Sequence, residues 1–417
     1  MIFNKKLIEC CFNITDGEHS SVQNDKNGSF FLLSNKNIID GQIKITPDDR
    51  RISLETYDKI HKRTKLAEGD ILISTVGTLG KTAIIKGEIN YDFQRSVGII
   101  KCNPSILNPQ YLYYFLNNPS IQKMLVNNSK GAVQKCIFIN DLKELQINCP
   151  ELTEQNTISK VLSCIDDKIA LNNKINAKLE QMAKTLYDYW FIQFEFPDGN
   201  GGAYKSSNGP MTYNEVLKRE IPTGWKVAPL KTLCDVKSGF PFSSDDYKTN
   251  SKYKLITIKN VLDRYISVDT DNTIESIPPK MPEYCLLKEG DILLSLTGNV
   301  GRVGMVFGEN LLLNQRVGIL NLKDHKWHSY LYLLFLQSSF RTLLEKISTG
   351  SNQKNLSPIE TEALPIIIPS MDIVERFSNL TEPLLQKIIK NYQENNKLEK
   401  LRDFLLPMLM NGQIKVG

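Results

Sequence analysis

Two long stretches of the chain repeat hydrophobic residues with a seven-residue period. In residues 154–190, heptad position a begins at Ile158 and position d begins at Val161. In residues 373–410, position a begins at Phe377 and position d at Leu380. A hydrophobic a/d pattern held over about five heptads predicts two coiled-coil helices. The alternative interpretation is an amphipathic helix packed on a globular core.

A segment of mixed pattern precedes each helical stretch. Short hydrophobic runs with nearby glycines predict strands, at 70–74, 83–85 and 97–100 in the first segment and at 291–295 and 317–320 in the second. One helix is expected to follow in each segment, over 109–126 and over 329–347. We therefore predict an α+β fold, in which two mixed α/β domains are separated by two long antiparallel coiled-coil helices.

The two segments are copies of one another. Residues 66–95 (LAEGDILISTVGTLGKTAIIKGEINYDFQR) and 287–316 (LKEGDILLSLTGNVGRVGMVFGENLLLNQR) are identical at 13 of 30 aligned positions. Further matches follow at a slightly shorter offset, such as 131–135 with 350–354 and 178–180 with 397–399. Two homologous halves predict a pseudo-twofold molecule that meets a partner in two places.

The segment boundaries follow from composition and from two prolines. Residues 194–223 are rich in glycine, serine and asparagine, which is typical of a linker. Pro150 and Pro369 mark the starts of the helical stretches. The expected order is a mixed domain (1–150), a helical spacer (151–193), the linker (194–223), a second mixed domain (224–369) and a second helical spacer (370–412).

Composition narrows the class of protein. No apolar run is long enough to cross a membrane and no signal peptide is recognisable, so we expect a cytoplasmic protein. Eight cysteines without a C-x-x-C pair indicate reduced thiols and no zinc ribbon. The net charge of +5 falls mainly on the two mixed domains, which supports nucleic-acid binding only weakly.

The sequence carries none of the common catalytic motifs that we sought. There is no N-P-P-[FY] loop of a DNA methyltransferase, no G-x-S-x-G and no G-x-x-x-x-G-K-[ST]. The nearest phosphate-binding match has its glycines, Gly77 and Gly80, three residues apart instead of five. His325 and His328 lack partners at metal-ligand spacing. We therefore predict no catalytic residue and no metal site in this chain.

A glycine-containing loop follows a strand that ends in serine in both halves, STVGTLGK at 74–81 and SLTGNVGR at 295–302. Hydroxyl, glycine and cationic groups suit a loop that binds a phosphate backbone, whereas the alternative is a hairpin turn that needs positive φ. A Gln-Arg pair follows each loop, and such side chains can read adenine and guanine in the major groove. Because both copies carry the pair although the two halves should read different sequences, a phosphate contact or a fold-support role is favoured for Arg95 and Arg316. The candidate DNA-binding residues are His19, Ser74, Thr75, Thr78, Lys81, Gln94, Arg95, Gln134, Lys135, Ser295, Thr297, Asn299, Arg302, Gln315, Arg316, Asn352, Gln353 and Lys354.

These motifs resemble one known family over nearly the whole chain. The marks are ITDGEH at 14–19, the twin E-G-D-I-L-[IL]-S-x-x-G-x-x-G segments, and LYDYWFIQFEF at 186–196 followed by EIPTGWKV at 220–227. Their order, together with the repeat, is similar to the DNA-specificity subunit of type I restriction–modification systems. The second half has KSGFPF at 237–242 in place of Asp-Gly-x-His, so a role for His19 does not extend to that half.

The resemblance implies two target-recognition domains, each reading half of a bipartite asymmetric site in double-stranded DNA. It implies that two methyltransferase (modification) subunits and the restriction (motor-nuclease) subunits dock on this chain. S-adenosylmethionine, ATP and Mg²⁺ would belong to those partners, and this chain would be non-catalytic. Two alternatives are a coiled-coil scaffold that binds DNA without specificity, and a methyltransferase or nuclease with diverged motifs.

Two more predictions concern the helices. The aromatic residues Tyr187, Tyr189, Trp190 and Phe191 form a candidate docking patch for a partner, or else cap the coiled coil. Asn172 and Asn391 occupy position a near the midpoints of their helices. Antiparallel packing in full overlap would bring the two amides face to face and fix the register, unless both point to solvent.

Overall fold

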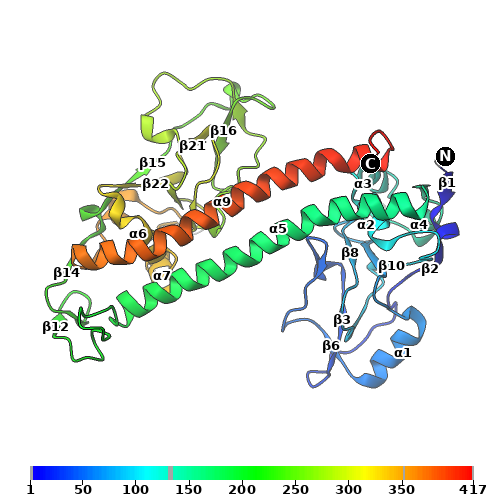
Figure 1. Ribbon diagram of the computed structural model, residues 1–417, viewed down its shortest axis with the longest axis horizontal. Coiled ribbons are helices and arrows are strands. Elements are labelled where there is room, and N and C mark those ends of the chain that lie inside the picture. The colour runs from blue at the N-terminus through cyan, green and yellow to red at the C-terminus, as the bar shows by residue number, and fades with distance from the viewer. Residues whose placement is uncertain (1–2, 130–134, 351–352, 416–417) are drawn as a thin grey trace. The chain divides into compact units, whose positions relative to one another are not determined.

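The computed structural model describes residues 3–129, 135–350 and 353–415 (Figure 1). The chain forms two compact units, of which unit 1 comprises residues 1–168 and 398–417, and unit 2 comprises residues 169–397. Each unit holds one mixed domain and part of both long helices. None of the described helices has the length and apolar character needed to cross a bilayer.

Unit 1 contains a four-stranded antiparallel sheet. Its order is β2 (Cys11–Asp16), β10 (Val97–Cys102), β7 (Ile71–Ser74) and β8 (Thr82–Ile84). In a second sheet, β3 (Phe30–Leu33) pairs with β6 (Arg51–Ile52) and runs parallel to β9 (Tyr91–Phe93). The smaller pairs are β1 (Phe3–Lys6) with β11 (Gln146–Cys149), and β4 (Ile38–Ile39) with β5 (Gln42–Ile43). All four residues of β7 are buried, as expected for an interior strand.

Unit 2 repeats this topology. Its main sheet has the order β15 (Cys234–Ser238), β22 (Val317–Leu322), β19 (Ile292–Ser295), β20 (Val303–Met305) and β17 (Arg264–Tyr265). Its second sheet has the order β18 (Thr273–Ile274), β16 (Tyr253–Ile256) and β21 (Leu311–Leu313). Further pairs are β14 (Lys226–Pro229) with β23 (Pro365–Ile368), and β12 (Met211–Asn214) with β13 (Arg219–Pro222). The predicted duplication is therefore confirmed in strand order.

The single helix predicted after each sheet is two helices in both units. Unit 1 has α2 (Pro109–Asn117) and α3 (Pro119–Asn127), and unit 2 has α6 (His328–Phe335) and α7 (Ser338–Ile347). In unit 1 the break arises because the Asn118 side chain caps α3 and Pro119 provides no backbone N–H. The remaining short helices are α1 (Leu54–Thr64), α4 (Ile139–Lys143) and α8 (Pro358–Glu362).

The predicted long helices are α5 (Leu152–Tyr187), which ends in a π-helical turn over Asp188–Ile192, and α9 (Met371–Met410). Within unit 2 they are antiparallel, because Asn172 contacts Asn395 while Asn176 contacts Asn391. Within unit 1, Arg402 donates to Asp166 at 3.1 Å, and Leu406 and Leu409 share a hydrophobic core with Leu162.

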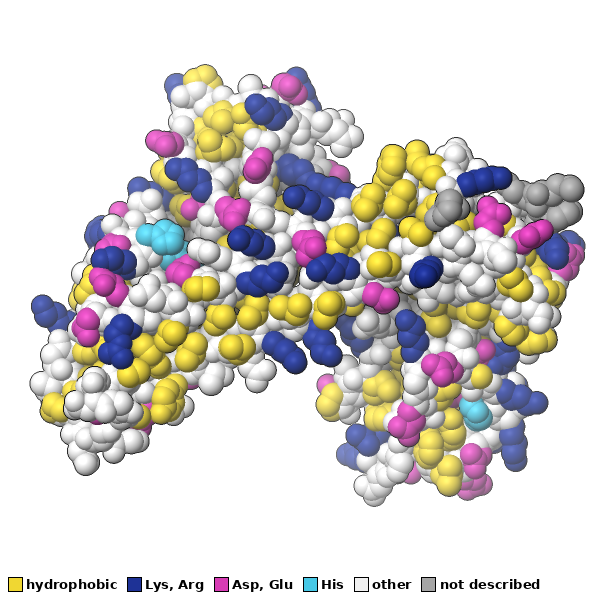
Figure 2. Space-filling model, in the orientation of Figure 1, with side chains coloured by type: hydrophobic (Ala, Val, Ile, Leu, Met, Phe, Trp, Pro, Cys, Tyr) yellow, Lys and Arg dark blue, Asp and Glu magenta, His cyan; other side chains and the backbone are white. Residues whose placement is uncertain are grey.

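The seam between the helices uses heptad positions a and e, so the predicted a/d assignment is wrong. Position e is buried at Leu162, Asn176 and Ala183 on α5. Residues at position d are more exposed: Val161 and Ile175 are half-buried, and the exposed fraction reaches 53% at Met182 and 45% at Leu401. An i, i+4, i+7 pattern fits either choice when d and e are both apolar. Figure 2 shows hydrophobic side chains at the surface along the path of α5.

Candidate nucleic-acid interface

The loop between β7 and β8 is held by the side chain of one buried serine. Ser74 Oγ donates to the carbonyl of Thr78 at 2.5 Å and accepts from the backbone N–H of Lys81 at 2.8 Å. Backbone hydrogen bonds from Ser74 N to Lys81 O and from Gly80 N to Ser74 O close the loop. Gly77 and Gly80 have φ of +78° and +79°, which L side chains rarely adopt. The interpretation as a hairpin turn with positive φ is confirmed.

The loop between β19 and β20 has the same four hydrogen bonds. Ser295 Oγ donates to the Asn299 carbonyl at 2.5 Å and accepts from the Arg302 N–H at 3.0 Å. The two closing backbone bonds join Ser295 with Arg302 and with Gly301. Both serine side chains are at most 1% exposed. We refer to residues 74–81 and 295–302 as the serine-closed loops.

Three other segments meet each serine-closed loop. In unit 1 the backbone of Thr75 bonds to Ser96 and to Ile137, and Glu18 bonds to Phe93 and to Arg95. The predicted stretches near residues 19, 95 and 135 are therefore brought together beside the loop.

Unit 2 repeats this convergence. Leu296 bonds through its backbone to Arg316 and Leu356, and Phe240 bonds to Leu313 and Gln315. Four separate chain segments thus form one small surface in each unit.

Most of the predicted DNA-binding side chains lie at the surface. The exposed residues are His19, Thr78, Lys81, Arg95, Lys135, Asn299, Gln315, Arg316, Gln353 and Lys354, and the half-buried ones are Gln94, Thr297 and Arg302. The side chains of Ser74, Thr75 and Ser295 are buried, so their predicted role as DNA contacts is wrong. Both serines bond within their own loops, and Thr75 Oγ1 donates to the carbonyl of Arg95. Gln134 and Asn352 lie outside the described residues.

The sequence alignment of the two Gln-Arg pairs is wrong by one residue. Phe93 pairs with Leu33 in β3, and Leu313 pairs with Ile256 in β16, so Phe93 and Leu313 are equivalent. The N–H of the next residue, Gln94 or Asn314, then donates to the carbonyl of that same Leu33 or Ile256. Gln94 is therefore equivalent to Asn314, Arg95 to Gln315 and Ser96 to Arg316. The shift arises because the connection before β21 is one residue shorter than the connection before β9.

Two residues that the sequence did not single out shape the surface of unit 1. Asn35 Nδ2 donates to the Val76 carbonyl at 2.8 Å, next to Gly77. Arg63, in the last turn of α1, donates to the Gly17 carbonyl and lies 3.7 Å from the carboxylate of Asp16. Asp16 in turn bonds to His19 Nε2 at 2.8 Å. Nothing in the local pattern marks these residues, because both contacts join segments that are distant in sequence.

The carboxylate of Glu18 lies in this part of unit 1, and its neighbours affect its pKa. Hydrogen bonds from Ser20 hold the pKa of Glu18 below its ordinary value. Glu18 is ionised at neutral pH, and the nearby guanidinium of Arg63 also favours its charged form. Such a carboxylate disfavours close approach of a phosphate at this point of the surface.

The family model for the type I restriction modification DNA specificity domain matches residues 22–181 and 222–400. The chain belongs to the type I restriction–modification DNA specificity family. The matches cover both halves of the internal repeat, so each half contains one specificity domain.

Relatives match this specificity-family chain over most of their own length. The MjaIX specificity subunit of Methanocaldococcus jannaschii is 29% identical over 386 residues, covering 90% of this chain and 84% of the relative. The HindI specificity subunit of Haemophilus influenzae is 24% identical over 402 residues, which cover 84% of this chain and 87% of the relative. The crystal structure of an S subunit from M. genitalium shares the fold, with a TM-score of 0.60 and 17% identity, over 98% of this chain and 96% of that chain.

Three of the four aromatic residues predicted to dock a partner are buried in the hydrophobic core of this chain. Tyr187, Trp190 and Phe191 are at most 4% exposed, so their assignment to a docking patch is wrong. The ring of Trp190 lies 5.5 Å from that of Phe377, between centroids. The alternative of a cap on the coiled coil is confirmed for these three residues. Only Tyr189, at 42% exposure, is available at the surface.

A layer of buried asparagines joins α5 to α9 in unit 2, but the predicted direct pair of Asn172 with Asn391 is wrong. Asn172 Nδ2 donates to Asn395 Oδ1 at 2.9 Å and to Glu394 at 2.8 Å. Asn391 Nδ2 donates to Asn176 Oδ1 at 2.7 Å. The reason is the a/e seam, in which an a residue of one helix faces an e residue of the antiparallel partner. All four asparagines are at most 5% exposed, so the solvent-facing alternative is also wrong.

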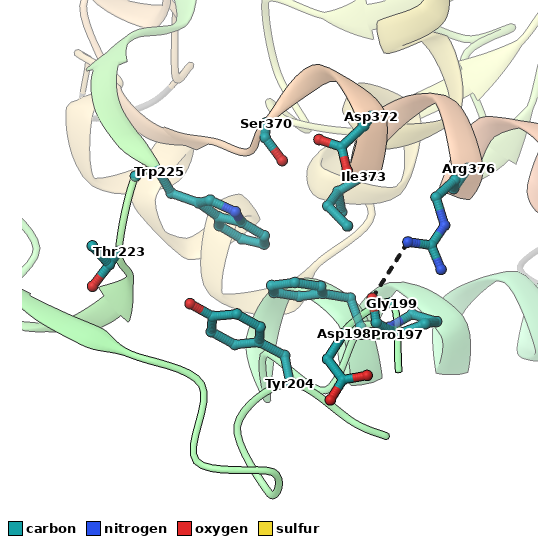
Figure 3. Close-up of a pocket in the computed structure, with 12 residues that line it drawn as sticks. Pro197, Asp198, Gly199, Tyr204, Thr223, Trp225, Ser370, Asp372, Ile373 and Arg376 are labelled. Carbon is teal, nitrogen blue, oxygen red and sulfur yellow. Dashed lines mark hydrogen bonds between the residues drawn. The ribbon is translucent and has the colours of Figure 1, made fainter. Parts of the chain in front are cut away.

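A cavity of about 330 Å³ lies elsewhere in unit 2, between the segment after α5 and the start of α9 (Figure 3). Phe196 stacks between Tyr204 and Trp225, at centroid distances of 4.5 and 5.0 Å. Arg376 donates to the Pro197 carbonyl at 3.4 Å. The residues that line the cavity include none of the candidate DNA-binding residues. Among the described residues, no group of three or more His, Cys, Asp or Glu could hold a metal ion.

Proposed function

We propose that this chain is the non-catalytic specificity subunit of a type I restriction–modification complex and that each unit reads one half of a bipartite DNA site. The observation that carries the proposal is the serine-closed loop, which occurs once in each unit with the same four hydrogen bonds. Exposed cationic and amide side chains surround both loops. Phosphate contacts position a protein on DNA, and amide and guanidinium groups read base edges.

The chemistry of the complex then belongs to its other subunits. The proposal assigns S-adenosylmethionine to two modification subunits, and ATP and Mg²⁺ to the restriction subunits. It places the complex in the cytoplasm, where bacterial and archaeal DNA is accessible. The relatives named as specificity subunits of type I restriction enzymes support this division of roles.

The exposed d positions of the long helices supply a docking surface for the modification subunits. Met182 on α5 and Leu401 on α9 are equivalent in the repeat, and both are about half exposed. On α5, Leu171 and Tyr189 are exposed on the same helical face as Met182. An apolar stripe beside a coiled-coil seam can receive the apolar face of another helix. Its presence in both halves suits two copies of one partner.

We expect Met182→Glu to remove one modification subunit and Leu401→Glu to remove the other. A charge placed in an apolar helix contact is costly to bury, whereas both positions tolerate it when they face water. Gln181→Glu is the matched control, because it adds the same charge at an exposed neighbour. Mass measurement of purified complexes reads the stoichiometry. Full assembly of the Met182→Glu, Leu401→Glu double variant, with normal thermal stability, would place docking elsewhere.

Deleting one heptad from α5 and the facing heptad from α9 tests the bipartite reading. Seven helical residues span about 10 Å, which corresponds to roughly three base pairs. The methylated motif of the variant complex should keep both half-sites and lose that many base pairs from the gap. Inserting one heptad in both helices is the control, and it should lengthen the gap equally. Altered half-sites with an unchanged gap would show that the helices do not set the spacing.

A further inference from the structure

The turn that precedes β10 or β22 has the same backbone in the two units but different side chains. Val97 N donates to the Gln94 carbonyl at 3.0 Å, and Val317 N donates to the Asn314 carbonyl at 2.9 Å. Each turn also bonds to its serine-closed loop, through Thr75 N to Ser96 O at 3.0 Å and through Leu296 N to Arg316 O at 3.1 Å. Arg95 N and Gln315 N also donate to the carbonyls of Glu18 and Phe240, so two neighbouring segments hold this backbone in each unit.

The side chains on this shared backbone differ at every equivalent position. The unit 1 turn carries Gln94, Arg95 and Ser96, and the unit 2 turn carries Asn314, Gln315 and Arg316. The side chains of Arg95, Gln315 and Arg316 are exposed. Within the described part of the chain, none of these three side chains has a hydrogen-bond or ion-pair partner. They are free to meet a ligand.

We propose that residues 94–96 and 314–316 are specificity turns, in which Arg95 and its equivalent Gln315 read different bases in the two half-sites. The inference rests on the proposed DNA-reading function and assigns residues within it. An arginine makes two hydrogen bonds to guanine O6 and N7, and a glutamine makes two to adenine N6 and N7. The structure therefore assigns a guanine contact to the unit 1 turn and an adenine contact to the equivalent position in unit 2.

A shared phosphate role for the two arginines does not fit this geometry. A phosphate contact common to both units requires a cation at the same place, but Arg95 is equivalent to Gln315 and Arg316 to Ser96. Lys81 and Arg302 meet that requirement, because each ends a serine-closed loop and donates its backbone N–H to the loop serine. The phosphate contact therefore belongs to Lys81 and Arg302, and base reading belongs to the turns.

The test exchanges the equivalent side chains in the complete complex and reads the methylated motif by sequencing the host genome. Arg95→Gln should alter one base position of one half-site, with roughly tenfold or greater loss of preference for guanine there. Gln315→Arg should alter one position of the other half-site. In each variant the opposite half-site and the gap should stay as in the wild type, which provides an internal control.

Lys81→Ala is the contrasting variant, for which we expect the same motif methylated less completely. The proposal is overturned if Arg95→Gln retains the wild-type motif and lowers only the extent of methylation, as a phosphate contact would. If Arg95→Gln lowers the melting temperature, Arg95→Lys is used as the test variant instead. Lysine keeps the positive charge but cannot make the bidentate hydrogen bonds of arginine. A wild-type complex without a bipartite motif would contradict the proposed function itself, which separates the two failures.

Discussion

Replacement of Trp190 by alanine is expected to lower the stability of unit 2 by about 3–5 kcal/mol. The indole is 4% exposed and packs against Phe377 of α9, with Phe191 at a centroid distance of 6.3 Å. Phe191 in turn contacts Phe377 at 4.7 Å and Tyr330 at 4.9 Å. The substitution would leave a large cavity where the end of α5, the start of α9 and α6 meet, and these rings cannot all move to fill it.

Thermal and chemical unfolding of the isolated chain measures this effect, with Tyr189→Ala as the matched control. Tyr189 is the neighbouring aromatic residue but is 42% exposed, so its loss should change stability by no more than about 0.5 kcal/mol. A stable Trp190→Ala protein that fails to bind a modification subunit would instead restore the docking interpretation for this residue.

Removing one amide of the asparagine layer is expected to destabilise the helix pair by about 1–3 kcal/mol. Asn172→Leu leaves the Oδ1 of Asn395 without its donor in a site that is 5% exposed. Replacing both residues by leucine removes both amides and adds apolar contact, so the double variant should recover most of the loss. The expected coupling in the double-mutant cycle is about 0.5–3 kcal/mol.

The pair Asn172 and Asn391 is the control for this cycle, because these two residues do not bond to each other. Their leucine substitutions should be closer to additive than those of Asn172 and Asn395. We also expect the Asn172→Leu, Asn395→Leu complex to methylate sites with more than one gap length, since a buried polar pair specifies register. Equal coupling in both cycles would contradict the assigned pairs.

The sequence predicted the large-scale features of this fold because the repeat made them visible twice. The duplicated strand-loop segments and both long helices lie where the pattern placed them, whereas the stretch 194–223, predicted as a linker, contains the β12–β13 hairpin. The incorrect residue-level predictions for the helices have one cause. A repeating hydrophobic pattern in the sequence does not show which of two adjacent apolar positions faces the partner helix. The heptad pattern could not separate d from e at Met182 and Ala183, and that choice decides which asparagines meet.

The candidate interface shows the same limit. Alignment placed Arg95 opposite Arg316, but the shorter connection before β21 moves the second arginine by one position. The buried serines were predicted as ligand contacts because a hydroxyl beside glycines is compatible with both roles. Only the hydrogen bonds of Ser74 to Thr78 and Lys81 show that it closes its own loop. Contacts from distant segments, such as Arg63 to Gly17, leave no mark in the local sequence.

Sequencing of methylated bases in a host that expresses this chain with its modification subunit tests the central claim most directly. The strain that lacks only this chain is the comparison. The account predicts one bipartite motif, with two short half-sites separated by a fixed gap, that appears only when this chain is present. Methylation that is unchanged by removal of the chain, or that follows a single continuous motif, would contradict it.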